Sequence, residues 1–200
     1  MAIKQGKDYE SVQIGGGATL PAGGYICQIL KAEERNNKNG KPMVVLALDI
    51  CEGDFAGFFQ TKWKNKKLGA DKPSEVKYPN DGMWYVNVEN TDGTTNRSFK
   101  GLCTALEDSG VEVWNAKKEF LMDNLQNAKV GVIFRREENE WNGNTYWQTK
   151  AFGARSITTI ESGDFTVPED KPIAQNNNYN FPQDISGVDS FSAAEDDIPF

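Results

Sequence analysis

The sequence predicts a mainly β fold with a helical insertion and an acidic tail outside the folded part. Three observations lead to this expectation: five runs rich in β-branched and apolar residues, one stretch in which the apolar period becomes helical, and a net charge of -7 that gathers at the C-terminal end. The 200 residues are 38% hydrophobic and 26% charged, which is typical of one main soluble domain.

The first three strands are expected before residue 90. Runs 24–34 and 41–53 are rich in apolar residues, and the Asn39-Gly40 pair between them favours a hairpin turn. The run "MWYVNV" at 83–88 is the third predicted strand. A long loop, including the basic and aromatic stretch 58–67, is expected to join the hairpin to this strand, and long ordered loops are often functional.

A helix is expected after the third strand, within "RSFKGLCTALEDSG". Four apolar residues recur there at helical spacing: Phe99, Leu102, Cys103 and Leu106. Thr95, Asn96 or Ser98 can cap its start, and Gly110 ends it. A shorter helix is predicted over 117–127.

The last two strands are expected at 128–138 and 145–156, on either side of Asn142-Gly143. Five strands with a helix between the third and fourth is the order of the OB-fold, a five-stranded Greek-key barrel. Its strand 2 and 3 face and two of its hairpin loops bind single strands or oligosaccharides. The alternative architecture is an unclosed α+β sheet.

A type I′ turn at Asn142-Gly143 predicts the register of the last hairpin. The predicted pairs are Arg135 with Lys150, Ile133 with Phe152, and Asn139 with Tyr146. Two cations then oppose each other, which is unfavourable unless an anion lies across them. Tyr146 and Phe152 share this face, and the other face, expected toward the core, carries Val132, Phe134 and Ala151.

Cations interleaved with aromatic rings are typical of a surface on which bases stack while phosphates are neutralised. The alternative interpretation is that Glu137 or Glu138 screens the cations of a merely solvated face.

The stretch "TKWKNKK" is a second candidate, because four lysines surround Trp63 and two phenylalanines precede them. Trp141 at the turn and Lys38 and Lys41 beside the first turn are weaker additions. The predicted nucleic-acid contacts are Lys38, Lys41, Phe59, Lys62, Trp63, Lys64, Lys66, Lys67, Arg135, Trp141, Tyr146, Lys150 and Phe152.

The sequence gives little support for catalysis, so we expect no enzyme, no cofactor and no metal. The chain has no histidine, and its three separated cysteines match neither zinc spacing nor a disulfide framework: Cys27, Cys51 and Cys103. The glycine-rich run 15–24 lacks the Gly-Lys-Ser/Thr of a phosphate loop. The alternative is a metal-dependent nuclease that uses acids such as Asp49, Asp54 or Glu89.

The acidic charge lies in the tail. Residues 164–200 hold eight acids and one lysine, whereas residues 1–163 hold 21 acids and 21 basic residues. The tail also contains "AQNNNYNFPQ" and four of the eight prolines, so we expect a folded domain over 1–163 and disorder over 164–200. The chain shows no apolar membrane span or signal peptide, which predicts a cytosolic protein.

The ending "EDDIPF" resembles the acidic tip of bacterial single-stranded-DNA-binding proteins. The stretches "GYICQILKAEERNNKNGKPMVVLALDICEGDFAG" and "FKGLCTALEDSG" are similar to the phage-encoded members of that group. The resemblance implies a protein that coats single-stranded DNA without strong sequence preference in the cytoplasm of a bacterial host. It leaves homo-oligomer formation open.

The resemblance also implies a role for the tip, which in that group docks into pockets of replication, recombination and repair proteins. The partner-binding residues would be Asp196, Asp197, Ile198, Pro199 and Phe200. Charge would steer the encounter and the small apolar anchor would supply most of the binding energy. The remaining alternative is a protein-only adaptor that ignores DNA.

Overall fold

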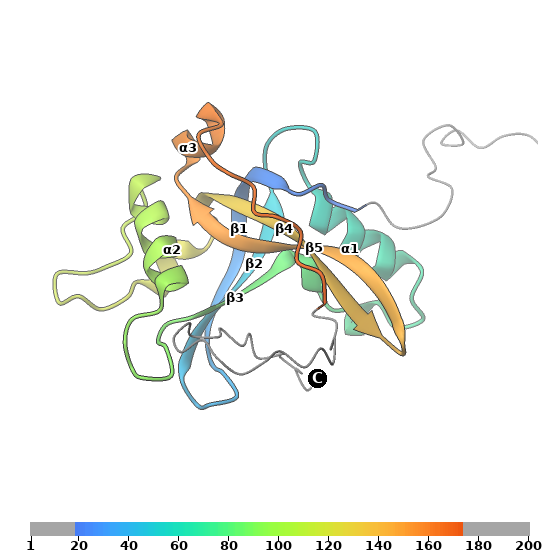
Figure 1. The fold of residues 1–200 in the computed structure, drawn as a ribbon, viewed down its shortest axis with the longest axis horizontal. Coiled ribbons are helices and arrows are strands. Elements are labelled where there is room, and N and C mark those ends of the chain that lie inside the picture. Colours follow the sequence, from blue (N-terminus) through green and yellow to red (C-terminus); the bar gives the residue numbers. More distant parts are fainter. Residues whose placement is uncertain (1–18, 174–200) are drawn as a thin grey trace, which may run out of the picture.

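The computed structural model of the protein describes residues 19–173. Within this range five strands form one antiparallel sheet in the order β3-β2-β1-β4-β5 (Figure 1). The strands are β1 (Gly23–Asn36), β2 (Pro42–Ile50), β3 (Met83–Asn87), β4 (Lys129–Trp141) and β5 (Asn144–Arg155). The helices are α1 (Phe58–Leu68), α2 (Arg97–Asp108) and α3 (Ile157–Ser162), with the 3-10 turns η1 (Pro73–Glu75), η2 (Asn80–Gly82) and η3 (Met122–Leu125). The predicted mainly β fold, with helix α2 between the third and fourth strands, is confirmed.

The hydrophobic core lies between the inner face of the sheet and α2. The alternating residues Val44, Leu46 and Leu48 of β2 are buried, as are the four apolar residues predicted for the inner side of α2. Asn96 caps this helix, because its side-chain oxygen accepts a hydrogen bond from the Ser98 amide at 2.8 Å. The predicted start and periodicity of α2 are therefore confirmed.

Stretch 58–67, expected as a loop, is helix α1. Its first turn is capped from a distant strand: Asp49 of β2 accepts a hydrogen bond from the amide of Phe59 at 2.9 Å. Gly57, at φ 77°, gives the left-handed entry that a residue with a side chain rarely adopts. Lysine and glutamine are also good helix formers, so their intrinsic preference agrees with this structure.

The predicted helix over 117–127 is wrong, because only the four-residue turn η3 is helical there. The Asn115 side chain accepts hydrogen bonds from the amides of Lys117 and Glu119, both at 2.9 Å, and so forms a local turn. Lys118 and Asn127 have positive φ values of 62° and 65°, which end any α-helix.

The β4–β5 hairpin has most of the predicted register. Asn142 and Gly143 both have positive φ, 50° and 77°, as a type I′ turn requires. Arg135 pairs with Lys150 and Asn139 pairs with Tyr146. The predicted pair of Ile133 with Phe152 is wrong: a β-bulge after Ile133 leaves Phe152 without a partner and pairs Ile133 with Gly153.

Residues 164–173, expected as the start of the tail, run from α3 across the sheet (Figure 1). A Cβ placed on Gly24 would lie 2.5 Å from Cζ of Phe165, so this contact needs a glycine. Farther along, Lys171 forms a parallel bridge with Glu137 of β4. The packed body therefore extends ten residues past the expected boundary, and the remaining tail, 174–200, lies outside the described residues.

Candidate nucleic-acid interface

One face of the β4–β5 hairpin carries exposed aromatic rings next to cations. Trp141, Tyr146 and Phe152 are 70%, 47% and 44% exposed. Strand alternation places Arg135 and Lys150 on the same face as Trp141 and Tyr146. The structure thus brings together five of the predicted contact residues on one surface, which we call the hairpin face: Arg135, Trp141, Tyr146, Lys150 and Phe152.

The two opposed cations of the hairpin face each have a protein partner. Arg135 forms an ion pair with Glu137, and its guanidinium lies over the Phe152 ring at 4.5 Å from the centroid. The Lys150 ammonium donates to Oδ1 of Asn139 at 2.9 Å. The screening by Glu137 that the sequence left as an alternative is therefore present, and no bound anion is needed to hold this pairing.

Arg135 still keeps an unsatisfied donor. Among the described residues, its Nε is a buried atom without a hydrogen-bond acceptor. A buried donor without an acceptor is unfavourable by about 1–3 kcal/mol.

The other face of the hairpin carries a pair that the sequence analysis did not select. The guanidinium of Arg136 lies over the Trp147 ring, 4.9 Å from its centroid, and Trp147 remains partly exposed. Strand alternation in the sequence already places Arg136 and Trp147 on the face opposite Arg135 and Tyr146. The sequence analysis missed them because it considered only the face that carries Arg135.

Helix α1 uses Trp63 for packing. The indole Nε1 donates to the carbonyl oxygen of Val76 at 2.9 Å, and the ring meets Tyr78 edge-on at 5.6 Å. Lys67 covers the ring, with its ammonium 3.7 Å from the centroid. The expectation of a free stacking ring in a loop is therefore wrong: this half-buried ring fastens α1 to the segment that follows it.

Two further predicted residues of this stretch have structural partners. Phe59 is 0% exposed and lies 5.9 Å from Phe134, ring to ring, so its prediction as a stacking contact is wrong. Lys62 forms an ion pair with Asp81 at 2.5 Å. Lys62 stays exposed despite this pair, and Lys64 and Lys66 are also exposed on α1.

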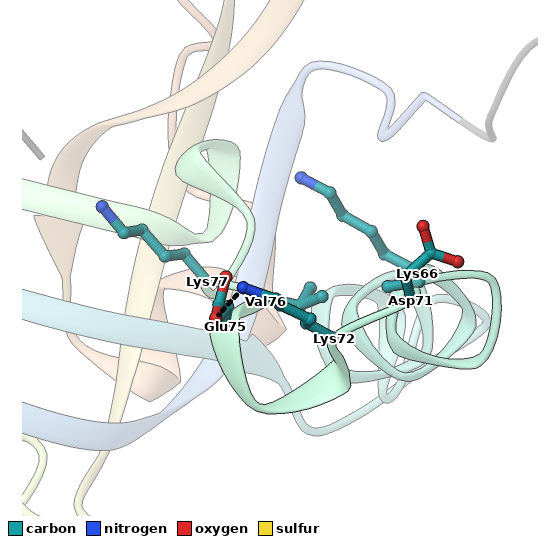
Figure 2. A pocket seen from close by; sticks show the side chains of 7 residues that line it. Lys66, Asp71, Lys72, Glu75, Val76 and Lys77 are labelled. Carbon is teal, nitrogen blue, oxygen red and sulfur yellow. Dashed lines mark hydrogen bonds and ion pairs between the residues drawn. The ribbon is translucent and has the colours of Figure 1, made fainter.

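An open pocket of about 540 Å³ lies between the end of α1 and η1 (Figure 2). Its lining residues are Lys66, Ala70, Asp71, Lys72, Glu75, Val76 and Lys77. Lys72 turns toward Glu75, with which it pairs at 2.9 Å, whereas Lys66 and Lys77 extend outward in Figure 2. The pocket adds two lysines that the sequence analysis left out.

The turn between β1 and β2 lies apart from the hairpin tip. Figure 1 places this turn at the lower left and the tip of the β4–β5 hairpin at the lower right. Lys41 donates to the carbonyl oxygens of Asn90 and Thr91, at 2.5 and 2.8 Å, and so holds the loop before α2. Lys38 is exposed in the turn. These two lysines do not join the hairpin face.

The side chains of Asp49 and Cys103 are buried in the folded domain. Burial raises the pKa of Asp49 despite its backbone hydrogen bonds, and this carboxylate caps α1. Burial also raises the pKa of Cys103 to about 11, which keeps the thiol protonated at neutral pH. Among residues 19–173 no group of three or more Cys, Asp or Glu side chains could hold a metal ion.

The predicted docking tip, residues 196–200, lies outside the described residues. No helix in the described part is long and apolar enough to span a membrane. In comparisons with known proteins, the family described as "Protein of unknown function (DUF669)" matches residues 7–159. No curated protein matches the chain.

Proposed function

The chain belongs to the DUF669 family, and from its own residues we propose that it binds single-stranded DNA without strong sequence preference and is not an enzyme. One observation carries the proposal: the hairpin face carries three exposed aromatic rings on the same side of the hairpin as Arg135 and Lys150, and Arg135 contacts the Phe152 ring. Exposed rings of this size stack with any base, which contributes about 1–3 kcal/mol per base, and neighbouring cations neutralise the phosphates.

The pairing of the cations sets the expected strength of this contact. Phosphates must compete with Glu137 for Arg135 and with Asn139 for Lys150. Such competition weakens the purely electrostatic part of binding, so stacking on the rings carries a larger share. The accessible lysines Lys64 and Lys66 of α1 add to the phosphate contacts.

The strand order supports an OB-type Greek-key barrel as the architecture. β1 pairs with both β2 and β4, and the sheet ends β3 and β5 also contact each other. Rolling a sheet of this order until its ends meet produces a closed five-stranded barrel. The β1–β2 and β4–β5 turns then correspond to the two loops with which OB-folds bind single strands. We therefore propose Lys38 and Lys41 as an additional contact region, separate from the hairpin face.

The tail completes the proposal. The sequence of the tip supports recruitment of replication, recombination or repair proteins through Asp196, Asp197, Ile198, Pro199 and Phe200. We place this activity in the cytoplasm of a bacterial host cell, with a phage-encoded protein that acts alone or as a homo-oligomer.

The test is a titration of the full chain with oligo(dT), followed by tryptophan fluorescence at several salt concentrations. We expect quenching, and affinity that falls as salt rises. Trp141→Ala should weaken binding by about 1–3 kcal/mol, whereas Trp141→Phe, which keeps a stacking ring, should retain most of the affinity.

Two outcomes would overturn the proposal. Absent or salt-independent binding by the parent chain contradicts DNA binding and favours a protein-only adaptor. Magnesium-dependent loss of labelled DNA favours the nuclease alternative. If the parent binds and Trp141→Ala binds equally well, the site lies elsewhere on the molecule.

A further inference from the structure

Half of β4 extends beyond its neighbour β1. The β1–β4 pairing ends at Gly23 with Phe134, so the backbone after Phe134 has no β1 partner on that edge. Residues 164–173, which we call the strap, cover part of this edge. The amide of Lys171 donates to the carbonyl oxygen of Arg136 at 2.9 Å. The amide of Glu138 donates to the carbonyl oxygen of Lys171 at 2.8 Å.

The strap also brings a carboxylate to Arg136, the arginine on the opposite face of the hairpin from Arg135. Oδ2 of Asp170 lies 3.3 Å from Nη1 of Arg136. The same guanidinium rests on the Trp147 ring. This arrangement repeats, on the opposite face, the cation-on-ring pair of Arg135 and Phe152. A carboxylate and a phosphate oxygen make the same charge-assisted hydrogen bond to a guanidinium.

We propose that Arg136 and Trp147 form a second single-strand contact, and that the strap covers it with Asp170 in the place of a phosphate. A phosphate would bind the guanidinium of Arg136 and a base would stack on the indole of Trp147. This inference rests on the proposed function, and it adds a regulated site to it: the end of the strap leaves β4 when DNA enters.

The two ends of the strap differ in how firmly they are held. Phe165 packs against Gly24 and Ile160 on the outer face of the sheet. At the other end, Asp170 and Arg136 are both 43% exposed, and a surface ion pair of this kind contributes little. Three hydrogen bonds also join this end to β4: the two backbone bonds of Lys171, and one from the amide of Ile173 to Oε2 of Glu138 at 3.1 Å. None of residues 170–173 is buried, so this end can detach while Phe165 stays in place.

The first measurement compares two neutralised carboxylates in the full chain. Asp170→Asn removes the charge that faces Arg136, and Glu169→Gln removes the same charge one residue earlier. We expect Asp170→Asn to raise oligo(dT) affinity by about two- to fivefold over Glu169→Gln, because the strap opens more often. Adding Arg136→Ala to Asp170→Asn should remove this gain.

The second measurement needs no substitution. Hydrogen exchange of the Glu138 amide, which donates to the strap, should become faster when oligo(dT) is added to the full chain, whereas backbone amides of the β1–β2 pairing should not. Unchanged or slower exchange at Glu138, or equal affinities of Asp170→Asn and Glu169→Gln, would overturn the strap proposal while DNA binding stands. A chain that does not bind oligo(dT) at all overturns the proposed function as well.

Discussion

In the proposed function, Glu137 competes with phosphates for Arg135, and Glu137→Gln is the change that tests this. The two side chains are 23% and 19% exposed, so their ion pair is shielded from water more than an ordinary surface pair. Glutamine keeps the length and the hydrogen-bonding oxygen of glutamate while removing its charge. Arg135 should then neutralise one further phosphate.

The magnitude follows from counterion release. Each phosphate neutralised on a single strand steepens the slope of log affinity against log salt by about 0.7. Over a fourfold change in salt, this slope corresponds to a factor of about 2.6 in affinity. The affinity of Glu137→Gln divided by the affinity of the parent should therefore be about 2.6 times larger at 50 mM salt than at 200 mM.

The assay is the oligo(dT) titration at both salt concentrations, with Glu161→Gln as the matched control. Glu161 is an exposed carboxylate on α3, outside the β4–β5 hairpin. The control removes the same charge from the whole chain without releasing Arg135. If the two variants have the same slope, or if Glu137→Gln keeps the slope of the parent, Arg135 does not meet a phosphate.

Three other predictions concern stability and the tail. Asp49→Ala should lower the free energy of unfolding by about 0.5–2 kcal/mol, because α1 loses its cap. Burial raises the pKa of Asp49, so its ionisation should destabilise the folded chain as pH rises from the ordinary carboxyl pKa through the raised one. Asp49→Asn should remove that pH dependence in urea unfolding curves, and an unchanged dependence would assign it to another group. Phe59→Ala should destabilise the fold by about 3–5 kcal/mol in the same measurement, and a near-neutral effect would contradict its place in the core. Phe200→Ala should leave oligo(dT) affinity unchanged and abolish capture of host proteins, whereas an unchanged captured set would show that the tip does not dock.

The sequence predicted the elements whose signals are local. The spacing of Phe99, Leu102 and Leu106 defines α2 by itself, and Asn142-Gly143 defines the turn and most of the register. The bulge after Ile133 could not be predicted, because alternation alone does not show where a strand gains a residue. Helix α1 was missed for a related reason: its cap is Asp49, which lies on another element.

The candidate site was predicted in part. The hairpin face came from register and residue type, both of which are local properties. The roles of Phe59 and Trp63 depend on which surfaces pack together, and composition could not distinguish a ring in the core from a ring offered to a base. The strap was unexpected, since an acidic, proline-containing stretch gives no sign that its first ten residues contact β1 and β4.

Beyond Glu138, where the backbone bonds to the strap end, the β4–β5 hairpin continues as a ribbon of two strands. Such ribbons coil more strongly than strands held inside a wide sheet. The rings of Tyr146 and Trp141 therefore point in directions that rotate about the axis of the ribbon. A single strand that stacks on both rings must wind around the hairpin, and its bases cannot stay in one continuous stack. This predicts that DNA bound to the hairpin changes direction along it.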